Sequence, residues 1–168
     1  MSNSITPVTI RIADFSLTKD AQAFVQLMQE YAQDPMGGGE PIADTLLASL
    51  PQTLKTYPGA FSVIAWQGDR PIGLTNCFET LSTFKALPLI NVHDLVVSSQ
   101  SRGLGIAPKM LAKVEQVARE RGCCKLTLEV LEGNERARQV YLEFGFKGYE
   151  LDEAFGSAQF WEKPLNRA

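Results

Sequence analysis

The sequence predicts an α+β fold in which a mixed, mostly antiparallel sheet is flanked by helices, with residues 1–168 forming a single domain. Three observations lead to this prediction. The 168 residues are 45% hydrophobic and 21% charged, which suits one globular domain with a substantial core. The first half contains two helical stripes and several short strands. The second half contains a strand, a helix and another strand in succession, and such a unit makes the two strands parallel through a right-handed crossover.

The first elements are a strand and two helices. Val8–Ile12 alternates apolar and polar residues, as a strand does. An apolar stripe with helical spacing predicts the first helix and consists of Phe24, Leu27, Met28 and Tyr31. This helix ends before Asp34–Glu40, because a proline and three glycines there favour a loop. A second helix, with Asp44 as its N-cap, ends at Pro58.

The remaining elements follow from changes in periodicity. Phe61–Trp66 and Ile72–Glu79 flank Gly68-Asp69-Arg70-Pro71, which predicts a hairpin, and Leu89–Val97 is a further strand. A helical stripe then runs from Ile106 to Ala118 and ends at Gly122. The predicted elements after it are a strand over Leu126–Val130, a helix containing Ala137, Val140, Tyr141 and Phe144, and two short strands, Phe146–Leu151 and Ala158–Glu162.

Charge and cysteine content exclude several functional classes. Lys and Arg total 16 and Asp and Glu total 19, so the net charge is −3, which argues against a nucleic-acid partner. No apolar run approaches the ~18 residues of a membrane span, so we expect no membrane partner. The three cysteines, Cys77, Cys123 and Cys124, lack disulfide and zinc-ligand patterns. They are interpreted as buried small hydrophobic residues, with no metal cofactor and a cytoplasmic location.

A glycine-rich turn joins the strand ending at Val97 to the next helix, and its sequence is Arg102-Gly103-Leu104-Gly105-Ile106-Ala107. Small residues let a ligand approach the backbone, and the first amides of a helix lack internal partners. With the helix dipole they suit a phosphate or pyrophosphate, although a simple tight turn fits the same residues. A P-loop is excluded, because Ile106 and Ala107 follow the second glycine where Lys and Ser/Thr are needed. A dinucleotide-binding fold does not fit either, because Pro108 occupies the place where that fold needs a third small residue.

The turn resembles the Gln/Arg-x-x-Gly-x-Gly/Ala pattern of GNAT N-acetyltransferases. A second GNAT signature, Asn-x-x-Ala-x-x-x-Tyr-x-x-x-Gly-Phe, is matched by Asn134, Ala137, Tyr141, Gly145 and Phe146. The resemblance covers nearly the whole chain, because the earlier helices and strands follow the family's element order. It implies a GNAT fold with a central pair of parallel strands that splay apart, and acetyl-CoA (coenzyme A) as the co-substrate.

The resemblance also implies where coenzyme A binds. In the family, the main-chain amides of the glycine turn hold the pyrophosphate; the corresponding residues are Arg102, Gly103, Leu104, Gly105, Ile106 and Ala107. The main chain of Leu95, Val96 and Val97 would then lie beside the pantetheine arm. Asn134 would contact the cofactor, and its position before a helix makes it an N-cap as well.

Tyr141 is the residue that the resemblance assigns as general acid, close to the sulfur of acetyl-CoA. A phenol with a pKa of about 10 can protonate a thiolate whose conjugate acid has a pKa near 8.5. A tyrosine of the core is the alternative interpretation, because Tyr141 shares an apolar stripe with Ala137 and Val140.

His93 and Asp94 are the candidates for the general base that deprotonates the amine. Both lie on the strand leading to the turn, and histidine is the side-chain type that changes charge near neutral pH. Strand alternation predicts that only one of them faces the acceptor unless a bulge intervenes. His93 or Asp94 can instead be an ordinary hydrogen-bonded strand residue, and Glu79 and Glu129 are weaker candidates for the base.

The acceptor is expected to be a primary amine, either on a small molecule or on a lysine or peptide. In the family, the region between the first two helices borders the acceptor site, so the loop Asp34–Glu40, Phe78 and Phe84 are expected to shape it; a flexible connection is the alternative interpretation of the loop. The resemblance also implies a homodimer whose edge comes from the C-terminal strands. A non-catalytic acyl-CoA sensor is the alternative function.

Overall fold

The computed structural model describes residues 6–150, 152, 154 and 156–165. The chain forms two compact units, Met1–Leu128 and Glu129–Ala168. The first unit contains a five-stranded sheet, and its strands are β1 (Val8–Ile12), β2 (Ala60–Gln67), β3 (Arg70–Ser82), β4 (Leu87–Val97) and β5 (Leu126–Leu128). That one domain spans residues 1–168 stays a prediction.

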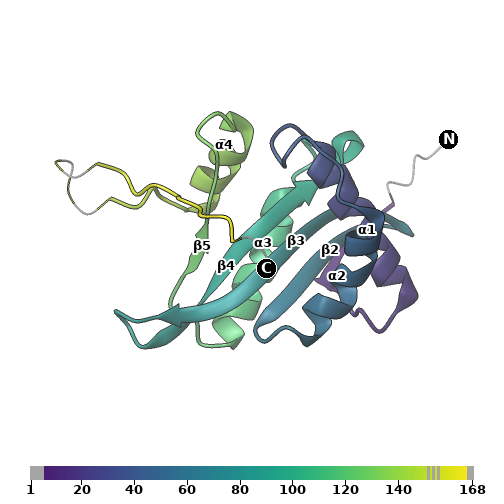
Figure 1. Cartoon of the computed structure of the whole chain (residues 1–168), viewed down its shortest axis with the longest axis horizontal. Coiled ribbons are helices and arrows are strands. Elements are labelled where there is room, and N and C mark those ends of the chain that lie inside the picture. Colours follow the sequence, from purple (N-terminus) through teal and green to yellow (C-terminus); the bar gives the residue numbers. More distant parts are fainter. Residues whose placement is uncertain (1–5, 151, 153, 155, 166–168) are drawn as a thin grey trace. The chain divides into compact units, whose positions relative to one another are not determined.

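The strands of the sheet follow one another in sequence order, β1-β2-β3-β4-β5. The first three pairings are antiparallel, and β4 pairs with β5 in parallel, as predicted. Helices α1 (Thr18–Gln33) and α2 (Asp44–Thr56) pack on one face, and α3 (Ile106–Glu120), which connects β4 to β5, packs on the other (Figure 1). The α+β class and the mixed sheet are therefore confirmed.

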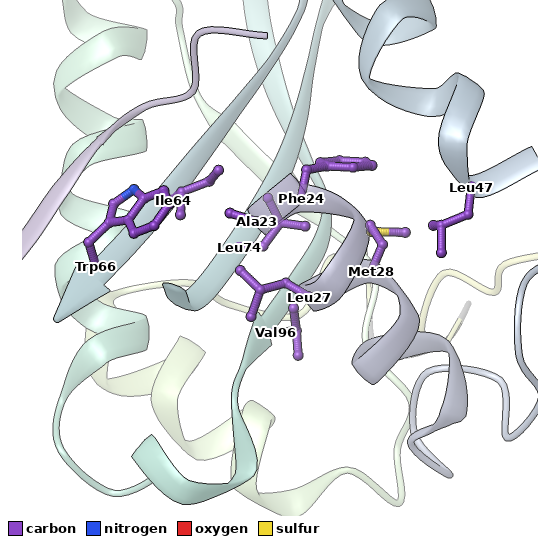
Figure 2. Close-up of a cluster of buried hydrophobic side chains, with 9 residues drawn as sticks. All are labelled: Ala23, Phe24, Leu27, Met28, Leu47, Ile64, Trp66, Leu74 and Val96. Carbon is purple, nitrogen blue, oxygen red and sulfur yellow. The ribbon is translucent and has the colours of Figure 1, made fainter. Parts of the chain in front are cut away.

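The largest described core cluster lies between the sheet and the helices α1 and α2 (Figure 2). Its members are Ala23, Phe24, Leu27, Met28, Leu47, Ile64, Trp66, Leu74 and Val96, all at most 9% exposed. The predicted apolar stripe of α1 supplies three of them, because residues three and four apart share a helix face. On the opposite face, Ala65 and Ile72 pack against Ile106 and Met110 of α3. This second cluster anchors the start of α3 to the sheet.

Several boundaries in the first unit differ from the prediction by one to three residues, among them the start of α2 and the end of β5. Ala43, not Asp44, is the N-cap of α2; Asp44 is the first helical residue and places a negative charge in the first turn, where the dipole favours it. Strand β5 ends at Leu128 and does not continue to Val130. The apolar alternation at Val130 therefore extends past the pairing with β4, which includes only three residues of each strand.

The second unit contains helix α4 (Glu135–Phe144), which confirms the predicted helix. The prediction of two C-terminal strands, Phe146–Leu151 and Ala158–Glu162, was wrong for the described residues. Only a single antiparallel bridge, Glu150 with Ser157, forms there, and Leu151 lies outside the described residues. The nearby aromatic side chains are exposed: Tyr149 63%, Phe160 77% and Trp161 83%. A two-stranded pairing is marginal without a buried apolar face, so local alternation was insufficient.

Candidate functional site

The glycine turn joins the end of β4 to α3 through a short 3₁₀-helix, η1 (Ser99–Ser101). Gly103 and Gly105 have φ angles of 80° and 70°, in the left-handed region that favours glycine. Gly105 is the N-cap of α3 and has no side chain to accept the first helical amides. The turn is exposed from Arg102 to Gly105, whereas the Ile106 side chain is buried in the core. The backbone of this turn therefore suits an anionic ligand.

Gly73 of β3 holds the start of α3 close to the sheet. A Cβ atom on Gly73 would lie 2.7 Å from Met110 Sδ, 3.3 Å from the Val96 carbonyl oxygen and 3.4 Å from Ile106 Cγ2. Only a residue without a side chain leaves this space to α3. Gly73 thus positions the glycine turn from the neighbouring strand, a role that the sequence motifs did not reveal. A glycine inside a strand pattern was the available signal.

The parallel pairing of β4 with β5 stops well before the turn. It includes Ile90, Asn91 and Val92, opposite Leu126, Thr127 and Leu128. Beyond Val92, β4 continues to Val97 while its described pairings are with β3 alone. The predicted segment Leu95, Val96 and Val97 belongs to this part of β4. Main-chain groups there are arranged as the edge of a strand, which an extended ligand with amide groups can pair with.

A bulge in β4 places His93 and Asp94 on the same face of the sheet. Asp94 is opposite Asn76, but the next pair is Cys77 with Val92, so His93 is the extra residue. Asp94 Oδ2 accepts a hydrogen bond from Asn76 Nδ2 at 2.9 Å, and the His93 ring contacts the Phe78 ring at a centroid distance of 5.3 Å. Asn76 and Phe78 are two residues apart on β3 and share the face covered by α1 and α2.

Asp94 lies at the end of a buried polar network. Asn76 is 3% exposed; its Oδ1 accepts from Ser62 Oγ at 2.7 Å and its Nδ2 also contacts Met28 Sδ at 3.2 Å. An ionised carboxylate only accepts hydrogen bonds, so the NH₂ group of Asn76 faces Asp94 and the amide oxygen faces Ser62, whose hydroxyl donates to it. The Asp94 carboxylate is consequently held in one orientation on a partly exposed part of the sheet.

Tyr31 is a further residue of this face, although its spacing in the sequence assigned it to the core stripe alone. Burial raises the pKa of Tyr31, and the charges of Asp94 and Asp34 raise this pKa further. The phenol is therefore held neutral beside two carboxylates. The signal that would have identified Tyr31 is its place at the last turn of α1, next to the predicted acceptor loop.

Aromatic side chains extend this face beyond His93. Phe78 contacts both His93 and Tyr57, whose ring centroid lies 5.7 Å from that of Phe78. Phe84 is not part of this group. It is fully exposed in the turn between β3 and β4, at the opposite end of β4 from the glycine turn. Phe78 therefore borders the face with His93 and Asp94, and Phe84 does not.

The loop Asp34–Glu40 is held by an ordered set of hydrogen bonds. The Asp34 carbonyl oxygen accepts from the amides of Gly37, Gly38 and Gly39 at 2.8, 3.2 and 3.1 Å. Asp34 Oδ1 accepts from the Met36 amide at 2.9 Å, and Asp34 Oδ2 accepts from Arg102 Nη2 at 2.7 Å. The loop Asp34–Glu40 thus contacts the first residue of the glycine turn.

Glu79 and Cys77 are directed away from this face. Glu79 forms an ion pair with Arg121 at 3.0 Å, just after the end of α3. Burial raises the pKa of Cys77 to about 12, so its thiol stays protonated and is a poor nucleophile near neutral pH. Glu129 belongs to the second unit. Among the described residues, no group of three or more His, Cys, Asp and Glu side chains is placed to hold a metal ion.

The second signature starts and ends helix α4. Asn134 is the N-cap, as predicted, and its Oδ1 accepts from the Ala137 amide at 3.2 Å. Gly145 ends the helix with a φ of 108°, and the amides of Gly145 and Phe146 donate to the Tyr141 carbonyl oxygen. The Tyr141 ring packs edge-on against Phe146 at 5.9 Å. Cofactor binding by Asn134 and Tyr141, and the acid role of Tyr141, stay predictions.

The chain is similar to known proteins in sequence and in fold. Bovine (Bos taurus) thialysine N-epsilon-acetyltransferase is 37% identical over 90 residues, which cover 54% of this chain and 51% of that protein. The chain thus matches about half the length of this relative. The uncharacterized N-acetyltransferase YhfO of Bacillus subtilis is 27% identical over 143 residues, covering 82% of this chain and 89% of YhfO.

Solved structures share the fold at low sequence identity. A transcriptional regulator from Bacillus halodurans superimposes with a TM-score of 0.77 at 20% identity, covering 95% of this chain and all of that one. An aminoglycoside acetyltransferase from an uncultured soil metagenomic sample, in complex with sisomicin, gives a TM-score of 0.75 at 16% identity and covers 94% and 97% of the two chains.

No described helix is both long and apolar enough to cross a membrane.

The profile of the Acetyltransferase (GNAT) family matches residues 24–146, from the middle of α1 to the end of the second signature. This range includes the glycine turn, the bulged strand β4 and helix α4. The match confirms the resemblance drawn from the two motifs, and it covers well over half of the chain. The chain belongs to the GNAT acetyltransferase family.

Proposed function

We propose that this protein transfers an acetyl group from acetyl-CoA to a primary amine by direct attack in a ternary complex. The observation that carries the proposal is the glycine turn. Two left-handed glycines expose the backbone at the start of α3, next to a strand end whose pairing with β5 has already stopped. A Cβ atom on Gly105 would have no neighbour within 4 Å, so there is room for a bulky anion against this backbone.

In the proposed reaction, the neutral amine nitrogen attacks the thioester carbonyl carbon. The new C–N bond forms, the C–S bond breaks, and the thiolate leaves with the bonding electron pair. One proton passes from the amine to a base on β4, and another passes from the Tyr141 hydroxyl to the thiolate. Main-chain N–H groups of Val96 or Val97 stabilise the oxyanion of the tetrahedral intermediate. Asn134 and Tyr141 contact coenzyme A, as the second signature implies.

The face with His93 and Asp94 supports an amine acceptor. Asp94 provides a carboxylate, held by Asn76, that attracts the ammonium form of the substrate. His93 is exposed beside it and provides a nitrogen that can take the proton, directly or through one water molecule. We therefore assign amine binding to Asp94 and proton removal to His93. The relatives named for thialysine and for aminoglycosides support a cationic amine as substrate.

Calorimetry and an acetylation panel test the proposal. The purified protein should bind coenzyme A, and it should consume acetyl-CoA in the presence of at least one amine among thialysine, lysine, sisomicin, spermidine and a peptide with a free N-terminus. Binding of coenzyme A without acetylation of any amine would favour the acyl-CoA sensor. No affinity for coenzyme A would overturn the proposal. A homodimer and a cytoplasmic location also stay predictions, and gel filtration checks the former.

A further inference from the structure

We propose that Arg102 is a positioning residue through which coenzyme A, bound at the glycine turn, rigidifies the acceptor loop Asp34–Glu40. This inference rests on the proposed function, because it takes coenzyme A as the ligand of the turn. It goes further in giving the Arg102 side chain a role that is separate from its main chain. The consequence is a direct link between the cofactor site and the acceptor site.

The Arg102 side chain contacts two segments at once. Its Nε donates to the carbonyl oxygen of Val97, the last residue of β4, at 3.0 Å, and its Nη2 donates to Asp34 Oδ2 at 2.7 Å. The planar guanidinium presents several donors in a fixed arrangement, so one side chain can bind both acceptors simultaneously. Because Arg102 begins the glycine turn, a ligand that fixes its main chain also fixes the point from which the guanidinium, held on the Val97 carbonyl, reaches Asp34.

Asp34 connects the Arg102 guanidinium to the acceptor loop. Its carbonyl oxygen and Oδ1 together accept hydrogen bonds from four of the loop amides, those of Met36, Gly37, Gly38 and Gly39. Both charged side chains are partly buried, 34% exposed for Arg102 and 21% for Asp34, which strengthens their attraction relative to a fully solvated pair. The hydrogen bond from Arg102 lowers the pKa of Asp34, which therefore stays ionised near neutral pH.

The loop in turn positions a side chain of the acceptor face. A Cβ atom on Gly37 would overlap the carbonyl oxygen of Tyr31 and lie 2.8 Å from Tyr31 Cδ2, so the loop packs directly against this tyrosine. The charge of Asp94 contributes, after burial, to the raised pKa of Tyr31. A second link runs parallel to the first, since Glu30 Oε1 accepts from the Ser99 amide at 2.8 Å. The contacts thus lead from the turn to the loop and on to the face where the amine is proposed to bind.

Hydrogen exchange of the loop amides tests this link without any amine substrate. The amides of Gly37, Gly38, Gly39 and Glu40 are the probes, because each is hydrogen-bonded to Asp34 or Ala32. Exchange is measured by mass spectrometry or NMR with and without saturating coenzyme A, whose binding is confirmed by calorimetry. In the unmodified protein, coenzyme A should slow exchange of these amides by roughly 5-fold or more.

Two variants remove the link, and one control leaves it intact. Asp34→Asn keeps an oxygen for the Met36 amide but turns an NH₂ group toward the guanidinium. Arg102→Lys keeps the charge but cannot bind both acceptors. Asp34→Asn should bind coenzyme A with nearly unchanged affinity, and both variants should lose most of the slowing of exchange in the loop, because only the link through Glu30 and Ser99 remains. Asp69→Asn is the matched control: it breaks another Asp ion pair, with Lys19, in which the Asp69 side chain is 97% exposed. It should retain the full effect.

Several results would overturn the inference. Coenzyme A could bind the unmodified protein without changing loop exchange, or it could slow exchange equally in all variants. A loss of coenzyme A affinity in Asp34→Asn would also overturn it, because the pair would then belong to the cofactor site itself. Absence of coenzyme A binding to the unmodified protein is a different result, since it overturns the proposed function as well. If Asp34→Asn does not fold, Arg102→Lys tests the same link from the other side of the ion pair.

Discussion

Asn76 lies directly opposite Asp94 on β3 and β4, and its Nδ2 donates to Asp94 Oδ2 at 2.9 Å. The register slips by one residue immediately after this pair, so His93 has no partner of its own on β3. Two adjacent polar residues of one strand therefore face the same side, which regular alternation forbids. This local irregularity places both residues of the proposed acceptor site on one face of β4.

Substitution of His93 and Asp94 should have separable effects on kinetics. His93→Gln should lower kcat by roughly 10²-fold or more, because glutamine cannot take a proton from the amine. Asp94→Asn should mainly raise KM for the amine, because it removes the charge that attracts the ammonium group. Steady-state kinetics with an amine that the unmodified protein acetylates would measure both kcat and KM. The reverse pattern would exchange the two roles.

Tyr141→Phe should lower kcat by roughly 10²–10⁴-fold and leave the affinity for coenzyme A unchanged. The hydroxyl is lost, whereas the ring and its packing against Phe146 are kept. Phe144→Leu is a useful control, because it alters the same aromatic group on α4 without removing a hydroxyl. Single-turnover acetylation and calorimetry give the two quantities. An unchanged kcat in Tyr141→Phe would remove this residue as the acid.

Gly105→Ala should weaken coenzyme A binding more than its effect on stability explains. Its φ of 70° is costly for alanine, by about 1–2 kcal/mol in the free energy of unfolding, and a Cβ would project into the space proposed for the pyrophosphate. Gly122, just after α3, is the matched control: its φ is 69° and a Cβ there also has no neighbour within 4 Å. Gly122→Ala should cost similar stability and spare the affinity. Equal affinities for the two variants would argue against the turn as the anion site.

Asp20→Asn should destabilise the protein by about 1.5–3 kcal/mol near neutral pH. Its side chain is fully buried, and its two oxygens accept from Arg11 Nη1 and Nη2, each at 2.6 Å, and from the Asp14 amide. The hydrogen bond with Arg11 is the largest cause of a lowered Asp20 pKa.

The role of Asp20 also predicts how the free energy of unfolding changes with pH. Because the folded pKa lies below the unfolded value of 3.8, the contribution of Asp20 is present above about pH 4 and is lost as the pH falls through the folded pKa. Urea titrations at about pH 7 and about pH 3 should therefore show a smaller acid loss for Asp20→Asn than for the unmodified protein. An identical acid loss in both proteins would contradict the assignment.

Local patterns explain why much of the chain was predictable. The helical stripe of α1, the glycine turn and the cap at Asn134 each depend on residues within one or two turns of one another. Backbone conformation and apolar spacing are encoded at that range, so both signatures could be recognised before any contact was known. The prediction of the two C-terminal strands was wrong because a strand also needs a partner strand and a buried face, and local alternation provides neither.

By itself, the sequence determined the α+β class, the parallel β4–β5 unit, the family and the position of the glycine turn. Only the tertiary structure decided that His93 and Asp94 share a face, that Gly37 packs against Tyr31, and that Arg102 reaches Asp34. The partners in these relationships come from different segments of the chain, or depend on the register between two strands. Side-chain packing and cross-strand hydrogen bonds determine these contacts and the strand register. Neither produces a periodic pattern that can be recognised in a single sequence.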